Sequence, residues 1–294
     1  MLKRRLLSIL LVLAMLVPTA FASQPAQDNM RGVWVASVYN IDYPSNTGLS
    51  ADALAAEADT MLDNIAAMGL GTVFLQVRPS ADALYKSSFF PQSRYVSGAC
   101  GAAPDGDFDV LAYWVEGAHK RGLQLHAWVN PYRITKDGKD ELDALPESSP
   151  ARQHPEWVVQ YENNYYFDPG LPAVQQLVVD GAAEIVRNYD VDGIHLDDYF
   201  YPGTDFNDTE TYARYGEKFD DIDDCVEYVN DREKPLALYY FTRNKKRARY
   251  MIQHTTSGGA CINDTIVQTA NGNLPFGGIG NSGIGAYHGR ESFE

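Results

Sequence analysis

Strand-like and helix-like segments alternate along the first 198 residues of this 294-residue chain, and this alternation constrains the fold more than any single residue does. Runs rich in Val, Ile and Leu alternate with segments whose apolar residues recur at helical spacing. Such an alternation predicts a parallel sheet whose strands are joined by helical crossovers. Strands are expected at residues 31–38, 72–79, 123–130 and 193–196, and helices at 54–68, 110–121 and 172–189.

The predicted strands end in polar and aromatic residues, which is how a (β/α)8 barrel displays an active site. A complete barrel needs eight strand–helix units and about 250 residues, whereas the four units here use up roughly the first 200. The expected fold is therefore α/β, the first half of a TIM-type barrel. Two long loops are expected, one ending near residue 109 and one running from residue 131 to about 168.

The amino terminus has the pattern of a secretory signal peptide. Lys3, Arg4 and Arg5 precede an apolar run at residues 6–17, and small residues follow before Ser23. This run is about 12 residues long, whereas a membrane-spanning helix needs about 20, so an uncleaved anchor is the weaker alternative. We expect Sec-type export to the periplasm, the cell envelope or the outside of the cell, with no membrane span left after cleavage.

The composition narrows the classes of partner. The chain has 24 Lys and Arg against 39 Asp and Glu, a formal net charge of −15, which disfavours nucleic acids and anionic membranes as partners. Its 3 cysteines show no CxxC motif and no Cys/His metal spacing, so neither a disulfide nor a metal site is assigned. No cofactor is expected, and the oligomeric state is left open.

Two adjacent carboxylates, Asp197 and Asp198, follow the fourth predicted strand. Hydrolysis of a sugar acetal commonly uses two carboxyl groups, one as an acid and one as a nucleophile or base. Side chains alternate along a strand, so His195 and Asp197 are expected on one face and Asp198 on the other. Asp197 is the stronger catalytic candidate and Asp198 the second. A helix cap or a solvated turn is the alternative interpretation of this pair.

Other polar and aromatic side chains follow the remaining strands. Around one barrel mouth they would bind sugar hydroxyls by hydrogen bonds and apolar sugar faces by ring stacking. Ordinary packing or a surface salt bridge is the alternative for each of them, and hydrogen bonding suits the two histidines better than metal binding. The candidate substrate-binding residues are Arg78, His126, Trp128, Asn130, Tyr132, Arg133, His195, Tyr199 and Tyr201.

Five segments, read in order, resemble one known family. They read RGVWV at 31–35, FLQVRPSADALY at 74–85, HAWVNPYR at 126–133, YFDPG at 166–170 and DGIHLDDYFYP at 192–202. Residues 30–221 are similar to the glycosyl-hydrolase-like family 10 of bacterial envelope proteins. The resemblance implies a (β/α)8 glycosidase-type barrel that acts on a polysaccharide, with peptidoglycan glycan strands as the expected substrate. Carried over, it places Asp197, Asp198, His195, Asn130 and Arg133 in the site.

The segment 222–294 resembles a different family. YVNDREKPLALY at 228–239 and LPFGGIGNSGIGAYHG at 274–289 are similar to the carboxyl-terminal part of aldehyde dehydrogenases. In that family the nucleophilic Cys, the catalytic Glu and the cofactor domain lie upstream of this stretch, so the resemblance implies no dehydrogenase activity here. Residues 278–283 fit GxGxxG, but no helix pattern follows, and we reject a dinucleotide site. Cys261 is expected to be buried in a strand.

These patterns predict three parts: a signal peptide at 1–22, a partial glycosidase-like barrel at 23–221 and an α/β aldehyde-dehydrogenase-like fragment at 222–294. The favoured function is that of an exported glycoside hydrolase-like protein acting on a cell-envelope polysaccharide, incomplete and inactive in this form. The alternatives are a dehydrogenase-derived fragment without its catalytic Cys, and an inactive carbohydrate-binding or chimeric product. Because a half-barrel leaves strand edges unpaired, low stability is expected.

Overall fold

The computed structural model describes residues 31–198, 201–203, 205–216, 219–264, 274–283 and 286. The expected signal peptide at 1–22 therefore lies outside the described residues. The chain divides into two compact units, Met1–Tyr215 and Gly216–Glu294, and each unit is described by itself below. Within the described ranges, no helix is both long and apolar enough to cross a membrane. The boundaries expected at residues 22 and 221 stay predictions.

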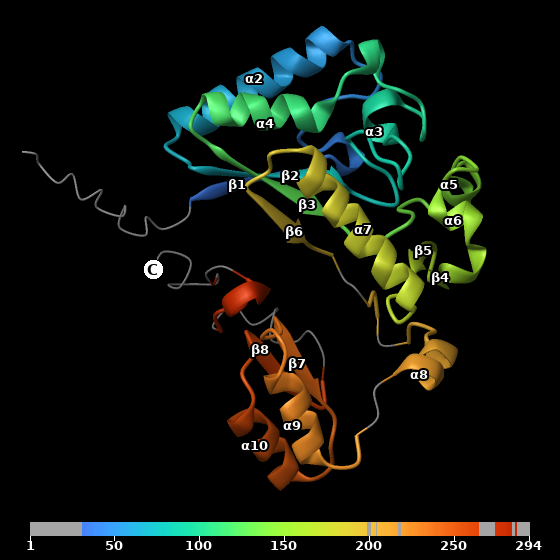
Figure 1. Cartoon of the computed structure of the whole chain (residues 1–294), viewed down its shortest axis with the longest axis vertical. Helices are drawn as coiled ribbons and strands as arrows, with labels where there is room; N and C mark the ends of the chain where they lie inside the picture. Colours follow the sequence, from blue (N-terminus) through green and yellow to red (C-terminus); the bar gives the residue numbers. More distant parts are fainter. Residues whose placement is uncertain are drawn as a thin grey trace, which may run out of the picture. The chain divides into compact units, whose positions relative to one another are not determined.

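The first unit is built on a parallel four-stranded sheet in the order β1-β2-β3-β6, as Figure 1 shows. Each strand lies within one residue or a few of its predicted position, and the described strands form no closed barrel. The strands are in register so that Trp34 pairs with Phe74, Phe74 with His126, and Trp128 with His195. Their bounds are β1 Gly32–Val35, β2 Thr72–Arg78, β3 Gln124–Val129 and β6 Gly193–Leu196.

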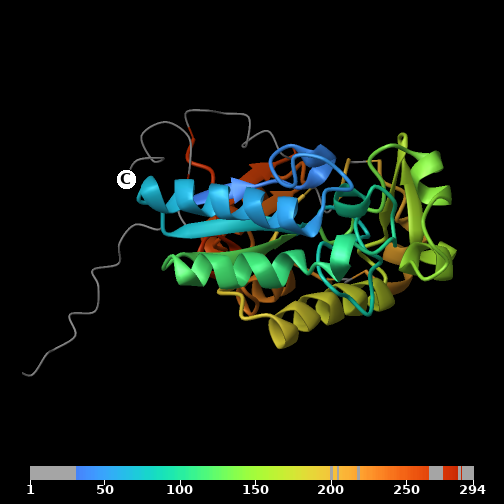
Figure 2. The same cartoon turned by 90° about the horizontal axis from the view of Figure 1, so that it is seen from above.

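Three long helices, α2 Ala51–Ala67, α4 Val110–Lys120 and α7 Pro172–Asn188, pack on one face of this sheet and share its main hydrophobic core. Every second residue of β2 and β3 enters this core, as strand alternation requires. Helices α2 and α4 run side by side in Figure 2. A Cβ at Gly117 of α4 would lie 2.8 Å from Leu62 Cδ1 of α2, so the glycine permits this close approach.

The helix ends follow from local residue chemistry. The Ser50 hydroxyl accepts a hydrogen bond from Ala53 N at 3.2 Å and caps α2, and Pro172 occupies the first turn of α7, where no backbone donor is needed. Shorter elements lie in the connections of this unit. They are η1 Val38–Asn40, α3 Arg94–Ser97, η2 Asp105–Asp107 and α8 Thr209–Tyr215.

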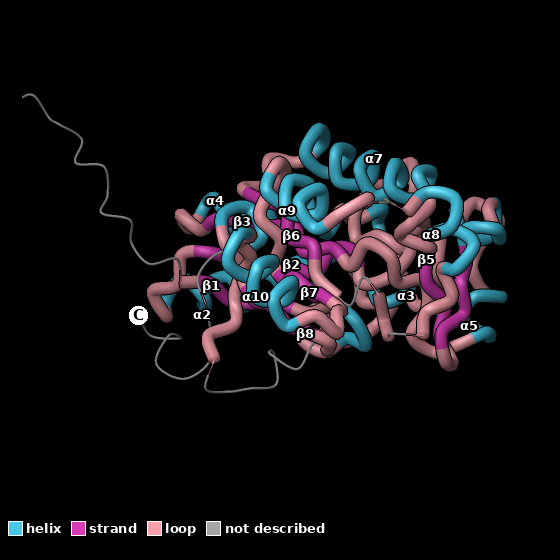
Figure 3. Tube along the Cα trace, turned by 90° about the horizontal axis from the view of Figure 1, so that it is seen from below, coloured by secondary structure: helices cyan, strands magenta, loops and turns pink. Residues whose placement is uncertain are grey.

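The segment 131–168 was expected to be an irregular loop, and this expectation was wrong. It contains the antiparallel hairpin β4 Val158–Tyr161 and β5 Asn164–Phe167. It also contains α5 Lys139–Asp143, α6 Pro150–Gln153 and η3 Pro155–Trp157. The hairpin and α5 lie together in both Figure 1 and Figure 3. Ile134, Leu145, Phe167 and Val174 form part of a second, smaller core beneath them.

The second unit consists of α9 Ile222–Asn230, β7 Ala237–Tyr240, α10 Lys245–His254, β8 Gly259–Ile262 and η4 Gly280–Ser282. Strands β7 and β8 pair in parallel, so this unit is also α/β. Its core is thin, because only Met251 and Cys261 are buried hydrophobic residues in the part that the structure describes. The expectation that Cys261 lies buried in a strand is confirmed.

Candidate functional site

A cluster of aromatic rings lies on the sheet face opposite the helices. It consists of Trp34, Phe74, His126, Trp128 and His195, and we call it the ring cluster. Trp34 stacks on Phe74 with ring centroids 4.5 Å apart, and Trp128 meets Trp34 edge-on at 5.0 Å. Trp34 is 47% exposed. The sheet therefore presents an aromatic, partly accessible surface, and the exposed ring of Trp34 is of the kind on which a sugar ring stacks.

The ring cluster also contains polar atoms that lack partners. Trp128 Nε1 and His126 Nδ1 are buried and have no hydrogen-bond partner among the residues that the structure describes. A buried polar atom without a partner costs about 1–3 kcal/mol, so both atoms lower the stability of this packed cluster. Burial lowers the pKa of His126, and the nearby Asp192 opposes this shift. Burial thus favours the neutral form of His126, whose Nδ1 is packed against Gly193 and closed to solvent.

Asp197 continues the ladder at the carboxyl end of β6. Its backbone N donates to Val129 O at 3.0 Å, so strand alternation places its side chain on the same face as His195. Burial lowers the pKa of His195, His126 lowers it further, and the Asp197 charge raises it. Asp197 itself is exposed. An accessible carboxylate therefore lies at the end of the strand that carries a neutral, half-buried imidazole.

Asp198 follows with a left-handed backbone φ of +102°, and its side chain pairs with Arg133. Both of its carboxylate oxygens accept hydrogen bonds from Arg133, one from Nε and one from Nη2. Each of the two side chains is only 9% exposed. Arg133 Nη1 also donates to the Tyr166 hydroxyl at 3.2 Å. The structure thus joins three separate sequence segments in one buried, bidentate ion pair.

Asn130 belongs to an amide network that ties the carboxyl ends of β1, β2 and β3 together. Gln76 Nε2 donates to Asn130 Oδ1 at 3.4 Å. Gln76 Oε1 accepts from the backbone N of Ser37 at 3.0 Å and of Val38 at 2.9 Å. Gln76, Asn130 and Ser37 are all buried. These side chains hold the strand ends in place, and Asn130 is the member nearest in sequence to the Arg133 ion pair.

Arg78 does not join the other candidates. A register shift between Gln76 and Arg78 changes the strand's alternation and directs the Arg78 side chain toward the helices. Its guanidinium lies 4.2 Å from the centre of the Phe90 ring, and a Cβ at Gly181 of α7 would come within 2.5 Å of it. Burial lowers the pKa of Arg78. This position, beneath α7 and 1% exposed, differs from the barrel-mouth position expected from the sequence.

The three tyrosine candidates fall in different environments. Tyr132 packs against the second core, and burial raises its pKa. The Tyr201 ring lies 5.5 Å from that of Phe206, and burial, followed by the nearby Asp208, raises the pKa of Tyr201. Tyr199 lies outside the described residues. The structure therefore leaves the contribution of these tyrosines to a site as a prediction.

Asp168 was not among the sequence candidates, although it lies in the YFDPG segment. It is buried, and its carboxylate accepts hydrogen bonds from Gly170 N at 2.9 Å and from the Thr211 hydroxyl of α8. The loop after β5 is thereby tied to α8. In the sequence, an acidic residue stands between the aromatic pair at 166–167 and the Pro-Gly pair at 169–170, and this signal could have identified Asp168. Tyr166, in the same segment, was also missed as a partner of Arg133.

Metal ligands do not gather at this site. In the part of the chain that the structure describes, no three His, Cys, Asp or Glu residues lie close enough together to hold a metal ion. His126 and His195 approach each other with ring centroids 5.3 Å apart, without a carboxylate or thiolate as a third ligand.

Comparisons with known proteins agree with both resemblances seen in the sequence. The family model described as glycosyl hydrolase-like 10 matches residues 29–255. The chain is 42% identical over 226 residues to glycosyl hydrolase YngK of Bacillus subtilis, covering 75% of this chain and 44% of that protein. It is 37% identical over 219 residues to glycosyl hydrolase DigH of Escherichia coli K12, covering 69% and 49%.

A further comparison concerns the second resemblance. The putative aldehyde dehydrogenase AldX of Bacillus subtilis is 54% identical over 76 residues, covering 26% of this chain and 17% of that protein.

The glycosyl hydrolase-like match runs past residue 221, the boundary expected from the sequence. The chain spans about half the length of the two glycosyl hydrolases that it matches.

Proposed function

Because the chain belongs to the glycosyl hydrolase-like 10 family, we propose that it acts on a cell-envelope polysaccharide, with the glycan strands of peptidoglycan as the expected substrate. The proposed reaction is hydrolysis of a glycosidic bond. The names of the two relatives, both glycosyl hydrolases, support the reaction class. The substrate rests on the family resemblance described above.

One observation carries the proposal: an accessible carboxylate, Asp197, follows the strand that contributes His195 to the ring cluster. Sugar rings offer an apolar face for stacking and hydroxyl groups for hydrogen bonds. Trp34 of the ring cluster supplies an exposed apolar face, and the exposed carboxylate of Asp197 can accept hydrogen bonds from hydroxyl groups. A saccharide on this surface would lie beside Asp197.

The two carboxylates differ in what they are free to do. Asp198 is engaged on both oxygens by Arg133 and is buried, so we assign it a positioning role that fixes the turn after β6. Asp197 is exposed and keeps its oxygens accessible. We therefore assign Asp197 as the carboxyl group that acts on the acetal, either as acid or as nucleophile.

Export is the second part of the proposal. It is supported by the basic residues at positions 3–5 and the apolar run at 6–17. Expression in a bacterium tests it by mass spectrometry of the accumulated protein. A mature protein beginning near Ser23 outside the cytoplasm is expected, and a cytoplasmic protein that keeps residues 1–22 would contradict export.

The activity test uses purified peptidoglycan glycan strands, with the products separated by chromatography and identified by mass. In contrast to the inactivity expected from the sequence, the proposal predicts that the chain shortens the strands and that Asp197→Asn lowers the rate at least roughly 100-fold, as loss of an acid or nucleophile does. Asp190→Asn is the matched control, because Asp190 lies just before the other end of β6 and its side chain is 97% exposed. Equal rates for the wild type and Asp197→Asn would remove Asp197 from the mechanism.

A binding measurement on the same strands separates hydrolysis from recognition. Binding without shortening would favour a carbohydrate-binding protein, an alternative that the ring cluster also fits. Trp34→Ala is expected to weaken binding in either case, since stacking area is lost. Absence of both binding and shortening would overturn the proposal.

A further inference from the structure

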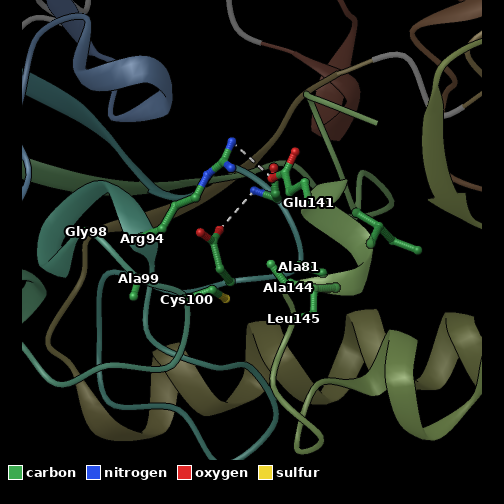
Figure 4. A pocket seen from close by; sticks show the side chains of 11 residues that line it. Ala81, Arg94, Gly98, Ala99, Cys100, Glu141, Ala144 and Leu145 are labelled. Carbon is green, nitrogen blue, oxygen red and sulfur yellow. Dashed lines mark hydrogen bonds and ion pairs between the residues drawn. The ribbon is translucent and has the colours of Figure 1, made fainter. Parts of the chain in front are cut away.

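A cavity of about 260 Å³ lies between the loop after β2 and helix α5, and Figure 4 shows its lining. Its polar side chains are Ser80, Asp82, Arg94 and Glu141, and the rest of its wall is apolar. The volume is slightly below the range of roughly 300–1,000 Å³ typical of sites for drug-sized ligands. It therefore suits a molecule about as large as a monosaccharide or an amino acid.

Among the described residues that line this cavity, Arg94 is the one cation, and it is shared between two carboxylates. Arg94 Nη2 lies 2.6 Å from Asp137 and 3.2 Å from Glu141, and the latter pair is drawn in Figure 4. Glu141 is also fixed from its other oxygen, which accepts from the backbone N of Lys136 at 2.6 Å and of Asp137 at 2.8 Å. Arg94 thus forms no ion pair with a third anion nearby, although its charge lowers the pKa of that group.

Asp82 is that third anion. It is 4% exposed, and among the described residues no Lys or Arg side chain lies within ion-pair distance of it. It accepts from Ser80 N at 3.2 Å, and the Ser93 side chain lies beside it. Burial raises the pKa of Asp82 to about 6. A buried carboxylate in this position gains stability from any cation that reaches it.

A second, independent observation points to a ligand. Ser80 lines the cavity, and its hydroxyl is buried and has no hydrogen-bond partner in the described part of the chain. An unpaired buried hydroxyl is costly, and it can both donate and accept. Ser80 N donates to Asp82 Oδ1 at 3.2 Å, so the two residues adjoin on one wall of the cavity.

We propose that this cavity binds a small primary amine, whose ammonium group donates hydrogen bonds to the Asp82 carboxylate and the Ser80 hydroxyl. The net negative lining disfavours anionic ligands. The apolar wall, which includes Cys100 and Ala144, accommodates the carbon skeleton of the ligand. Burial raises the pKa of the Cys100 thiol to about 12, so Cys100 is a neutral part of that wall. An amino sugar with a free amino group matches both the size and the charge.

This inference does not rest on glycan hydrolysis. The ligand contacts residues of the loop after β2 and of α5, whereas the proposed reaction uses Asp197 after β6. Binding is measured without turnover, so failure of one proposal leaves the other standing.

The test is isothermal titration of the purified chain with glucosamine at pH 7.5, compared with glucose and N-acetylglucosamine. We expect glucosamine to bind at least about tenfold more tightly than the two neutral sugars, because only it offers an ammonium group to Asp82. Equal affinities for the three sugars, or no glucosamine binding by the folded chain, would overturn the proposal.

Three variants locate the site. Asp82→Asn keeps the acceptor for Ser80 N and removes the charge, so we expect an about tenfold or larger loss of glucosamine affinity. Ala144→Leu fills the cavity from its exposed rim and is expected to weaken binding without disturbing the core. Asp143→Asn is the control. Asp143 is the last residue of α5 and precedes Ala144, but it does not line the cavity. Circular dichroism verifies that each variant is folded, and unchanged affinity in folded Asp82→Asn and Ala144→Leu would contradict the assignment.

Discussion

Replacing Arg133 by Met tests the buried ion pair that organises the candidate site. Arg133 and Asp198 are each 9% exposed, and the two hydrogen bonds between them are bidentate. Met has a similar length and packs well, so Arg133→Met removes the charge with little change of volume. It removes both hydrogen bonds that Arg133 donates to the Asp198 carboxylate and also the donor to Tyr166.

The expected loss of stability follows from that burial. Removing one partner of a buried ion pair costs about 3–5 kcal/mol, whereas an exposed pair is worth about 0–1 kcal/mol. Asp198→Asn keeps one acceptor for Arg133 and tolerates the left-handed backbone, so it should cost less, about 1.5–3 kcal/mol. The double variant should be more stable than Arg133→Met alone, because Asp198→Asn removes the charge that Arg133 no longer neutralises.

The assay is urea unfolding followed by tryptophan fluorescence. All 4 tryptophans of the chain lie in the first unit, so their fluorescence reports on the unit that contains the ion pair. The free energies of unfolding of the wild type, both single variants and the double variant form a double-mutant cycle. We expect an interaction energy of about 2 kcal/mol or more from this cycle.

An exposed ion pair of the same unit supplies the control. Lys139 and Asp143 are paired on α5 with side chains 66% and 52% exposed, so Lys139→Met should change the free energy of unfolding very little, because solvent screens an exposed pair. A loss of unfolding free energy in Arg133→Met no larger than that in Lys139→Met would contradict the expected effect of burial. Additive losses for Arg133→Met and Asp198→Asn would show that the two side chains do not interact.

Three further predictions follow from the site and its surroundings. The pKa of His195, measured by NMR, should lie below 6.5 and fall further in Asp197→Asn, because burial lowers it and the Asp197 charge raises it. Gly193→Ala should lower the free energy of unfolding by about 1–3 kcal/mol, since the new Cβ would lie 2.5 Å from His126 Nδ1. Cys100 should react with a thiol reagent at pH 8 roughly a hundredfold or more slowly than free cysteine, because burial raises the pKa of its thiol to about 12.

Each of these predictions has a matched comparison. A higher pKa for His195 in Asp197→Asn would show that the two groups do not interact as proposed. Gly71→Ala is the control for Gly193→Ala, because the nearest atom to its new Cβ is 4.0 Å away, and equal losses would contradict the packing argument. Peptide mapping by mass spectrometry resolves Cys100 from the other cysteines. If Cys100 reacted with the reagent as fast as free cysteine does, its thiol could not be buried.

The strand and helix positions of the first unit could be predicted because they depend on local patterns. The run from residue 72 alternates between residues that face the helices and residues that face the ring cluster, and β2 is found there. Pro172 opens α7 as expected, since proline suits a first helical turn. Helix α5 and the hairpin of β4 and β5 were missed, because they are short and depend on packing against the second core.

Local hydrophobicity sets where a strand ends, so the chemical groups that follow each strand, including Asp197 and Asp198, could be read from the sequence. The contacts of these groups depend on how distant segments pack together. The register shift before Arg78 directs it toward α7, and Asp198 pairs with Arg133, 65 positions away in the chain. Likewise, the cavity beside Asp82 exists because α5 folds back over the loop after β2. Such contacts form between segments that are distant in the sequence. The hydrophobic periodicity of one segment does not indicate which other segment it will contact.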